Sequence, residues 1–213
     1  FGPDNELDWY FGSISIGAGA SLTLDPKTVI KMGSGGVQVW GRLIADSTAG
    51  NEIVFTSLDD RSVGGLTGDG TPAKGDWSGV RVESTGTAVL DHVNVRYGGH
   101  SGEYALVSVV EEGSLTLTNS KLEQSSSYGV RVDGVEEQSL LNNVIENCSN
   151  YGIYIFDNDT DTLAENPEIR GNVINNTSYP INIYAGDGYT GDHRITGNSG
   201  SGNTGNYIVM PSS

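Results

Sequence analysis

The chain of 213 residues carries 27 acidic and only 11 basic side chains, so its net charge is −16. This charge argues against nucleic acids and anionic membranes as partners, because both are polyanions, and it predicts repulsion from acidic polysaccharides unless a cation bridges the two. No apolar run approaches the roughly 20 residues that a membrane-spanning helix needs. The single cysteine, Cys148, excludes an internal disulfide.

The N-terminal part contains a possible cap, two short alternating segments and an insertion. Residues 1–13, FGPDNELDWYFGS, are expected to form the cap, in which three aromatic residues at 9–11 are available as a lid. Apolar–polar–apolar triplets follow in GGVQVWG (35–41) and SGVRVES (78–84), and such alternation predicts short strands with one buried face. The segment 59–77 between them departs from this spacing and predicts a long inserted loop.

From residue 104 onward one sequence motif recurs, in which a tyrosine and a small residue precede an apolar–polar–apolar triplet. Its tyrosines, Tyr104, Tyr128, Tyr151 and Tyr179, stand 23 to 28 residues apart. A second alternating segment recurs between the copies of this motif, at 90–99, 117–127, 140–150 and 169–178. Two or three short strands in each unit of about 25 residues describe one coil of a solenoid, which buries its apolar face only by stacking on its neighbours.

Aligning the second segments places equivalent residues in files along the predicted stack. One file is apolar and two are mostly polar: Val95, Leu122, Ile145 and Ile174; Ser120, Asn143 and Asn172; Ser125, Cys148 and Thr177. Side chains of one file lie about 4.8 Å apart, so asparagine amides and hydroxyls can bond to their copies above and below. Cys148 is therefore expected to be a packed, inert thiol.

These segments resemble a known family. The phrases GASLTLDPKTVIKMG, GRLIADSTAGNEIVFTS, GDWSGVRVES, LDHVNVRYGG and GSLTLTNSKLEQSS are similar to right-handed parallel β-helix domains of secreted and cell-surface microbial proteins, a fold shared with pectate lyases. The resemblance covers roughly residues 14–207. It implies one all-β domain over 1–213, a single-stranded right-handed parallel β-helix of about seven coils. The scaffold serves lyases, glycosidases, polysaccharide binders and adhesin stalks alike, so function has to be argued from the site.

The central residue of each triplet and the residue after the triplet are expected to point outward. On adjacent coils this places Tyr154, Phe156 and Tyr184 on one face, with Arg131 and Asp133 beside them. Aromatic faces with neighbouring hydrogen-bonding groups suit the C–H faces of sugar rings. These five residues are the predicted polysaccharide-binding site. The alternative is that outward aromatic residues are there only because they fit strands well.

Acidic loops follow this face and predict a calcium site. Asp157, Asp159 and Asp161 alternate, and Asp187 belongs to the loop of the next coil. Calcium collects six to eight oxygen ligands, often from aspartates at alternate positions. The alternative is a solvated acidic loop. Asn158 in this segment lies in an exposed glycosylation sequon.

Catalytic residues are hard to find in this sequence. A pectate-type lyase needs a basic residue to take up a proton and a calcium ion to acidify that proton. Arg131 beside Asp133 is the best, weak, candidate. A glycosidase needs two carboxylates across a groove, which Asp133 and Asp157 meet only by chance in so acidic a chain.

We therefore expect a non-catalytic, secreted or surface-displayed module that acts as a rigid stalk or adhesion domain and holds a polysaccharide. The alternatives are a calcium-dependent polysaccharide lyase and a structural subunit of an extracellular filament. The C-terminal segment NYIVMPSS is a bare apolar strand. It predicts either end-to-end self-association or further domains in a longer chain, because uncovered strand edges pair readily.

Overall fold

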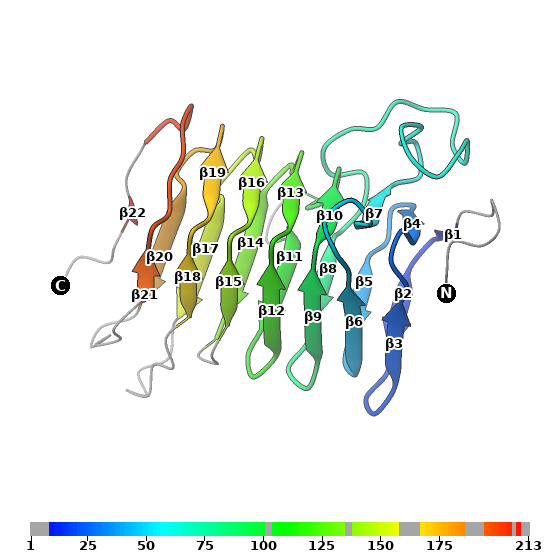
Figure 1. The fold of residues 1–213 in the computed structure, drawn as a ribbon, viewed down its shortest axis with the longest axis horizontal. Coiled ribbons are helices and arrows are strands. Elements are labelled where there is room, and N and C mark those ends of the chain that lie inside the picture. The colour runs from blue at the N-terminus through cyan, green and yellow to red at the C-terminus, as the bar shows by residue number, and fades with distance from the viewer. Residues whose placement is uncertain are drawn as a thin grey trace.

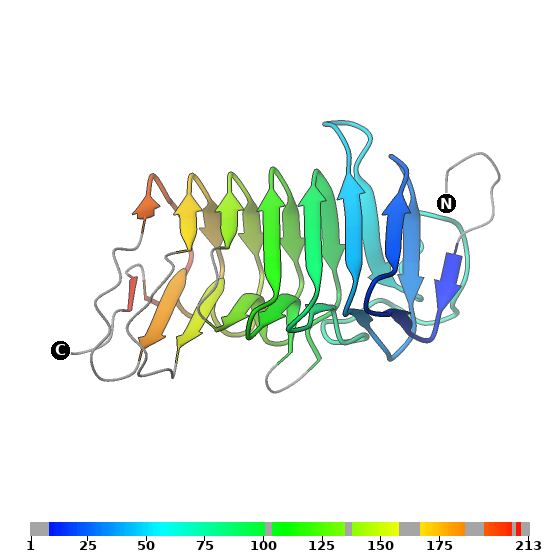
Figure 2. The ribbon, with the colours of Figure 1, turned by 90° about the horizontal axis from the view of Figure 1, so that it is seen from below.

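The computed structural model describes residues 9–100, 104–134, 138–157, 167–185, 194–205 and 208–209. These residues wind into an elongated solenoid, with the earliest strands at one end and the latest at the other (Figure 1, Figure 2). All secondary structure assigned to them is strand. In this part of the chain there is accordingly no helix long and apolar enough to span a membrane.

The strands form three sheets. Sheet A has seven strands: β1 (Trp9–Phe11), β4 (Val29–Met32), β7 (Ile53–Ser57), β10 (Val93–Arg96), β13 (Lys121–Glu123), β16 (Val144–Glu146) and β19 (Val173–Asn175). Sheet B has eight: β2 (Ile14–Ile16), β5 (Val37–Val39), β8 (Val80–Val82), β11 (Ala105–Val110), β14 (Tyr128–Asp133), β17 (Ile153–Asp157), β20 (Ile181–Ala185) and β22 (Ile208–Val209). Sheet C has seven: β3 (Ser21–Leu24), β6 (Arg42–Asp46), β9 (Thr87–Asp91), β12 (Ser114–Thr118), β15 (Ser139–Leu141), β18 (Glu168–Arg170) and β21 (Arg194–Thr196).

From β1 to β21, consecutive strands belong to sheets A, B and C in turn, so each of these coils contributes one strand to each sheet, and neighbouring coils pair in parallel. The last strand, β22, pairs with β20 in sheet B. The predicted right-handed parallel β-helix is confirmed. Of the segment expected to form a cap, Trp9–Phe11 form β1 and pair with β4 as the first strand of sheet A. Residues 1–8 lie outside the described part of the chain.

The predicted apolar file is an inner row of sheet A. Val95, Leu122, Ile145 and Ile174 pair with one another from coil to coil, and all four are fully buried. Phe55 continues the row toward the N-terminus. Burying one such side chain contributes about 1.5–3 kcal/mol, and the stacked coils share this burial because each covers the apolar face of the next.

The first polar file is a buried hydrogen-bonded ladder that runs one coil further than predicted. The side-chain oxygen of Asn143 accepts a bond from the backbone N–H of Ser120 (3.0 Å), that of Asn172 from Asn143 (2.9 Å), and that of Asn198 from Asn172 (2.9 Å). The Nδ2 atoms of Asn143, Asn172 and Asn198 donate to backbone carbonyls of the preceding coil. The ladder thus satisfies the buried backbone groups at one corner of the helix.

The second polar file is buried as well. Ser125, Cys148 and Thr177 are all buried, and the hydroxyls of Ser125 and Thr177 donate to the backbone carbonyls of Tyr128 and Tyr179. Burial raises the pKa of the Cys148 thiol to about 12. The thiol is therefore protonated at neutral pH and has little nucleophilic character.

The corner between sheets C and A requires a left-handed backbone conformation in five successive coils. One residue at each corner has a φ between +50° and +66°: His92, Asn119, Asn142, Gly171 and Gly197. Asparagine and glycine adopt this conformation more easily than other residues. This requirement accounts for part of the asparagine and glycine content of the chain.

Candidate functional site

The predicted polysaccharide-binding residues lie on the outward side of β14, β17 and β20 in sheet B. Arg131 is in register with Tyr154, and Asp133 with Phe156, which in turn is in register with Tyr184. The alternate residues of the same strands point inward and are buried. The alternation of each triplet thus places two outward side chains per coil in two parallel rows, as the sequence predicts.

Six aromatic rings form one continuous cluster on this side of the helix. We call it the aromatic face: Tyr128, Tyr151, Tyr154, Phe156, Tyr179 and Tyr184. Tyr128 stacks on Tyr154 with ring centroids 5.1 Å apart, and Phe156 stacks on Tyr184 at 5.3 Å. Tyr151 lies 5.8 Å from Tyr128, 5.4 Å from Tyr154 and 5.9 Å from Tyr179.

Sequence reasoning used the corner tyrosines only to mark the repeat and missed their part in this cluster. The signal was present, because Tyr128, Tyr151 and Tyr179 recur once per coil and stand in register. Tyr104 is offset by one residue, since Ala105 is the partner of Tyr128. Tyr184 has 52% of its surface exposed, whereas Tyr154 and Phe156 are only partly exposed. Because of this difference in exposure, Tyr184 is the residue of the cluster that is most accessible to a ligand. Burial raises the pKa of the Tyr154 phenol, and the neighbouring Tyr128 raises it further.

Arg131 and Asp133 lie close together and form an ion pair. Arg131 is therefore not accessible as a base. The Nε atom of Arg131 donates to Oδ1 of Asp133 at 2.8 Å. Its guanidinium lies over the rings of Tyr128 and Tyr154, at 5.9 and 5.8 Å from their centroids. Only 7% of the residue is exposed. An ion-paired arginine keeps its proton at any physiological pH, so this geometry argues against proton abstraction by Arg131.

A second, similar pair lies on the same face toward the N-terminus. Arg81 Nε is 3.1 Å from Glu83 Oε1, and Arg81 stands two coils from Arg131 in the same outward row, with Ser108 between them. The coil in between contributes Ser108, which is buried. Both arginines of this row thus bind the carboxylate of the residue two positions further along the chain.

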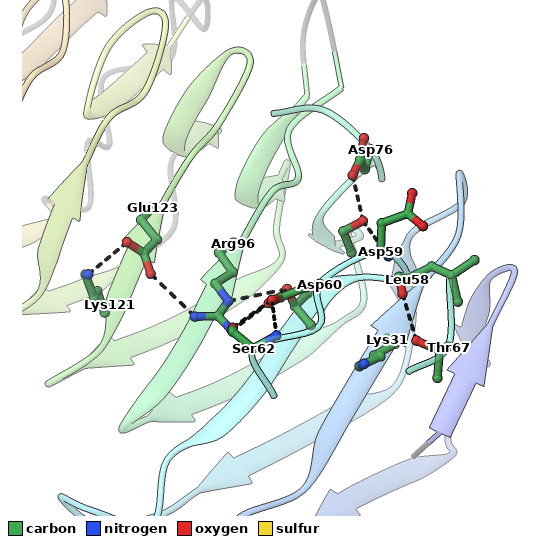
Figure 3. A network of polar contacts seen from close by, with 12 residues as sticks. Lys31, Leu58, Asp59, Asp60, Ser62, Thr67, Asp76, Arg96, Lys121 and Glu123 are labelled. Atoms are coloured by element: carbon green, nitrogen blue, oxygen red, sulfur yellow. Dashed lines mark hydrogen bonds and ion pairs between the residues drawn. The ribbon is translucent and has the colours of Figure 1, made fainter. Parts of the chain in front are cut away.

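The insertion between β7 and β8 is a loop that packs on the outer side of sheet A (Figure 3). Its Asp76 accepts a hydrogen bond from Ser57 at 2.6 Å, and its Asp59 accepts one from the N–H of Gly70 at 2.9 Å. The ammonium of the fully buried Lys31 donates to the carbonyl of Gly65 at 2.6 Å. At its C-terminal end Trp77 is buried in the core. The loop is therefore fastened at several points along its length.

Asp60 connects this loop to a row of charges across sheet A. Its carboxylate pairs with Arg96, and Arg96 lies 3.9 Å from Glu123. Lys121 bridges Glu123 at 2.8 Å and Glu146 at 2.9 Å. Figure 3 shows Arg96 between the loop and the neighbouring coil. The three carboxylates of the row share two basic groups, and each carboxylate contacts at least one of them, so the row fastens the loop to sheet A.

The predicted calcium ligands fall almost entirely outside the described residues. Asp157 ends β17, whereas Asp159, Asp161 and Asp187 lie outside the described ranges, as does the sequon at Asn158. Among the residues that the structure describes, no group of three or more acidic, histidine or cysteine side chains is arranged to hold a metal ion. Calcium binding stays a prediction.

Comparison with known families gives one match. Residues 73–212 match the family model described as right-handed beta helix region. No curated protein and no solved structure matches the chain. The matched segment contains β8 to β22 and therefore the whole aromatic face. The match covers more than half of the chain and agrees with the three parallel sheets; the chain belongs to the right-handed beta helix family.

Proposed function

We propose that this β-helix is a non-catalytic module that binds a polysaccharide on its aromatic face, as part of a secreted or surface-displayed stalk. The aromatic face itself carries the proposal. Rings that are partly exposed and held in fixed positions present apolar surface with polar edges, which suits the two kinds of surface on a sugar ring. Because the coils are hydrogen-bonded to one another, the rings lose little conformational freedom when a ligand binds.

Tyr184 is the expected principal contact. Within the cluster Phe156 stacks on Tyr184 with an interplanar angle of 10°, so one ring face of each is already engaged by the other. Tyr184 combines this support with the largest exposed fraction among the six aromatic residues. Phe156 then holds Tyr184 in place, and Tyr154, which contacts Phe156, extends the apolar surface behind it.

Removing this ring tests the proposal. Tyr184→Ala is expected to weaken retention in gels containing soluble polysaccharide by about tenfold or more, equivalent to about 1.4 kcal/mol. The combined Tyr154→Ala, Phe156→Ala and Tyr184→Ala variant is expected to abolish retention. These side chains point outward, so their loss opens no core cavity, and circular dichroism and thermal melting report on the fold.

Tyr10→Ala is the matched control. Tyr10 is 55% exposed but lies on β1 in sheet A, at the opposite end of the solenoid. Its loss is expected to leave retention unchanged. Unchanged retention of the triple aromatic variant on every polysaccharide that retains the unmodified protein would refute the aromatic face as the binding site.

We expect no cleavage of the bound polysaccharide because Arg131 is held in an ion pair. The lyase alternative gives this residue the role of base, yet its guanidinium is bound to Asp133 and covered by two tyrosine rings. Retained polysaccharide is accordingly expected to gain neither unsaturated nor reducing ends during prolonged incubation, with or without calcium.

Calcium binding at Asp157, Asp159, Asp161 and Asp187 is proposed separately. An ion that binds only the folded chain stabilises it by roughly 2.7 kcal/mol at a hundredfold excess over its Kd. Millimolar calcium is therefore expected to raise the melting temperature more than magnesium does, and Asp159→Ala with Asp161→Ala to remove the difference. Identical melting curves in calcium and in EDTA would contradict this site.

A further inference from the structure

The two arginines of the outward row of sheet B, Arg81 and Arg131, each pair with an acid two residues further along the chain. Arg81 pairs with Glu83 at 3.1 Å, and Arg131 pairs with Asp133 at 2.8 Å. In both pairs the acid stands two residues after the arginine, so the strand's alternation puts both side chains on the same side of sheet B. Glu83 and Arg131 are each only 7% exposed, which keeps the pairs close and limits the competition from water.

This pairing decides how the face meets a charged polymer. A polyuronate or sulfated chain carries an anionic group on many of its sugars and needs unpaired cations to offset the loss of hydration. Here the guanidinium groups of Arg81 and Arg131 are already paired with the carboxylates of Glu83 and Asp133. The chain as a whole carries −16, and charges within a Debye length of about 8 Å at physiological salt add to the local repulsion.

The next outward position offers a polar group without charge. Asn182 follows Tyr154 in the register of sheet B, one coil beyond it, and belongs to the same strand as Tyr184. An amide donates to and accepts from sugar hydroxyls equally well. The carboxylates of the two ion pairs likewise retain acceptor capacity for hydroxyl groups, because each carboxylate has about four lone-pair positions.

We infer that the ligand of the aromatic face is an uncharged polysaccharide, and that Glu83 and Asp133 determine this specificity by neutralising the two arginines. This inference rests on the proposed function of the same face. It names a ligand class and gives the two acids a role that differs from sugar stacking. The acids act through the arginines beside them, so they are positioning and specificity residues.

Pairs of polymers that share one sugar chain and differ only in charge distinguish the effect of charge from that of the sugar. The test uses a panel of uncharged β-glucans, mannans and xylans, each paired with its carboxymethylated derivative, in affinity electrophoresis at low and high salt. The unmodified protein is expected to be retained by at least one uncharged polymer, with little dependence on salt. Its retention by the carboxymethylated partner of that polymer is expected to be at least about tenfold weaker at low salt.

Removing the two acids is expected to reverse the exclusion. The Glu83→Gln and Asp133→Asn double variant keeps the shape of both side chains but removes the carboxylate charge that pairs with each guanidinium. Its retention by the carboxymethylated polymer is expected to rise about threefold to tenfold, as for the release of one or two partly exposed ion pairs, and to fall again at high salt. The effect is read as the ratio of retention by the carboxymethylated polymer to retention by its uncharged partner, because Asp133 belongs to the proposed binding face and its replacement also changes contacts with sugar hydroxyls.

The control changes the net charge equally but elsewhere. Glu146 pairs with Lys121 at 2.9 Å on sheet A, and Glu168 pairs with Arg170 at 3.0 Å on sheet C. The Glu146→Gln and Glu168→Gln double variant is expected to be excluded by carboxymethylated polymer like the unmodified protein. Melting curves of both double variants confirm that each is folded before the gels are compared.

The outcomes separate this inference from the proposed function. Stronger, salt-sensitive retention of the unmodified protein by a carboxymethylated polymer, lost in the triple aromatic variant, would overturn the inference and keep the proposed binding face. Equal behaviour of the two double variants would overturn the role of Glu83 and Asp133. Failure of the whole panel to retain the unmodified protein would overturn the proposed function and this inference together.

Discussion

Replacing Arg96 with methionine is expected to lower the free energy of unfolding by about 3–5 kcal/mol, because it leaves a buried carboxylate without its counter-charge. That carboxylate belongs to Asp60, of which only 2% is exposed. Thr56 donates to it at 2.6 Å, and Ser62 donates through both its hydroxyl and its N–H. These bonds hold Asp60 in place, so it cannot turn toward water when Arg96 is lost. Urea unfolding followed by circular dichroism measures the change.

Two further variants show whether the buried charge is the cause. Asp60→Asn combined with Arg96→Met is expected to be more stable than Arg96→Met alone, since no unpaired charge is then buried. Arg170→Met breaks the exposed pair with Glu168 and is expected to change stability by less than about 1 kcal/mol. A loss below about 1 kcal/mol for Arg96→Met would contradict the anchoring role of this ion pair.

The same ion pair predicts a dependence on pH. Burial alone tends to raise the pKa of Asp60, but hydrogen bonds from Thr56 and Ser62 and the charge of Arg96 outweigh burial and lower it. A carboxyl with a lowered folded-state pKa stabilises the fold above its unfolded pKa of about 3.9, and this contribution disappears as the pH falls through the folded-state pKa. The stability difference between the unmodified protein and Asp60→Asn is therefore expected to shrink below about pH 4.

Replacing Asn172 with alanine is expected to lower the free energy of unfolding by about 3 kcal/mol, since it strands several buried polar groups at once. Its Oδ1 atom accepts from the backbone N–H and the Nδ2 of Asn143, at 2.9 and 3.0 Å. Its own Nδ2 donates to the carbonyl of Leu140 at 2.8 Å. All three side chains are fully or almost fully buried, so water does not readily replace these bonds. Urea unfolding again gives the measurement.

Asn142→Gly provides the matched control for the ladder. Asn142 precedes the ladder residue Asn143, is exposed, and has a φ of +57° that glycine adopts without strain. Its replacement is expected to change stability by less than about 1 kcal/mol. If Asn172→Ala destabilised the protein no more than Asn142→Gly does, the polar file would be a packing feature and not a set of essential hydrogen bonds.

The repeating part of this fold is readable from the sequence because equivalent residues recur once per coil. The file of Val95, Leu122, Ile145 and Ile174 and the ladder through Ser120, Asn143 and Asn172 occupy the predicted positions. Asn198 was missed although the signal was present, since ITGN at 195–198 repeats IRGN at 169–172. The triplets after it lack clear alternation, so the last coil was not aligned.

Contacts that occur only once in the fold could not be predicted from the sequence repeats. Asp60 pairs with Arg96 across 36 positions in the sequence, and no periodicity links the inserted loop to sheet A. The predicted site residues Arg131 and Asp133 were placed correctly on the outward face, yet their ion pair and the covering tyrosines depend on rotamers and on ring stacking between coils. A pattern of residue types specifies which side of a strand a side chain occupies, but not which partner it meets there.

The aromatic face is proposed to bind polysaccharide without cleaving it. Affinity electrophoresis of the unmodified protein and Tyr184→Ala against the panel of uncharged polysaccharides, with the ends of the retained polymer measured afterwards, tests it most directly. The predicted result is retention of the unmodified protein, loss of about tenfold or more in Tyr184→Ala, and no new chain ends. Equal retention of both proteins would refute binding through Tyr184, and a rise in reducing or unsaturated ends would show that the polymer is cleaved.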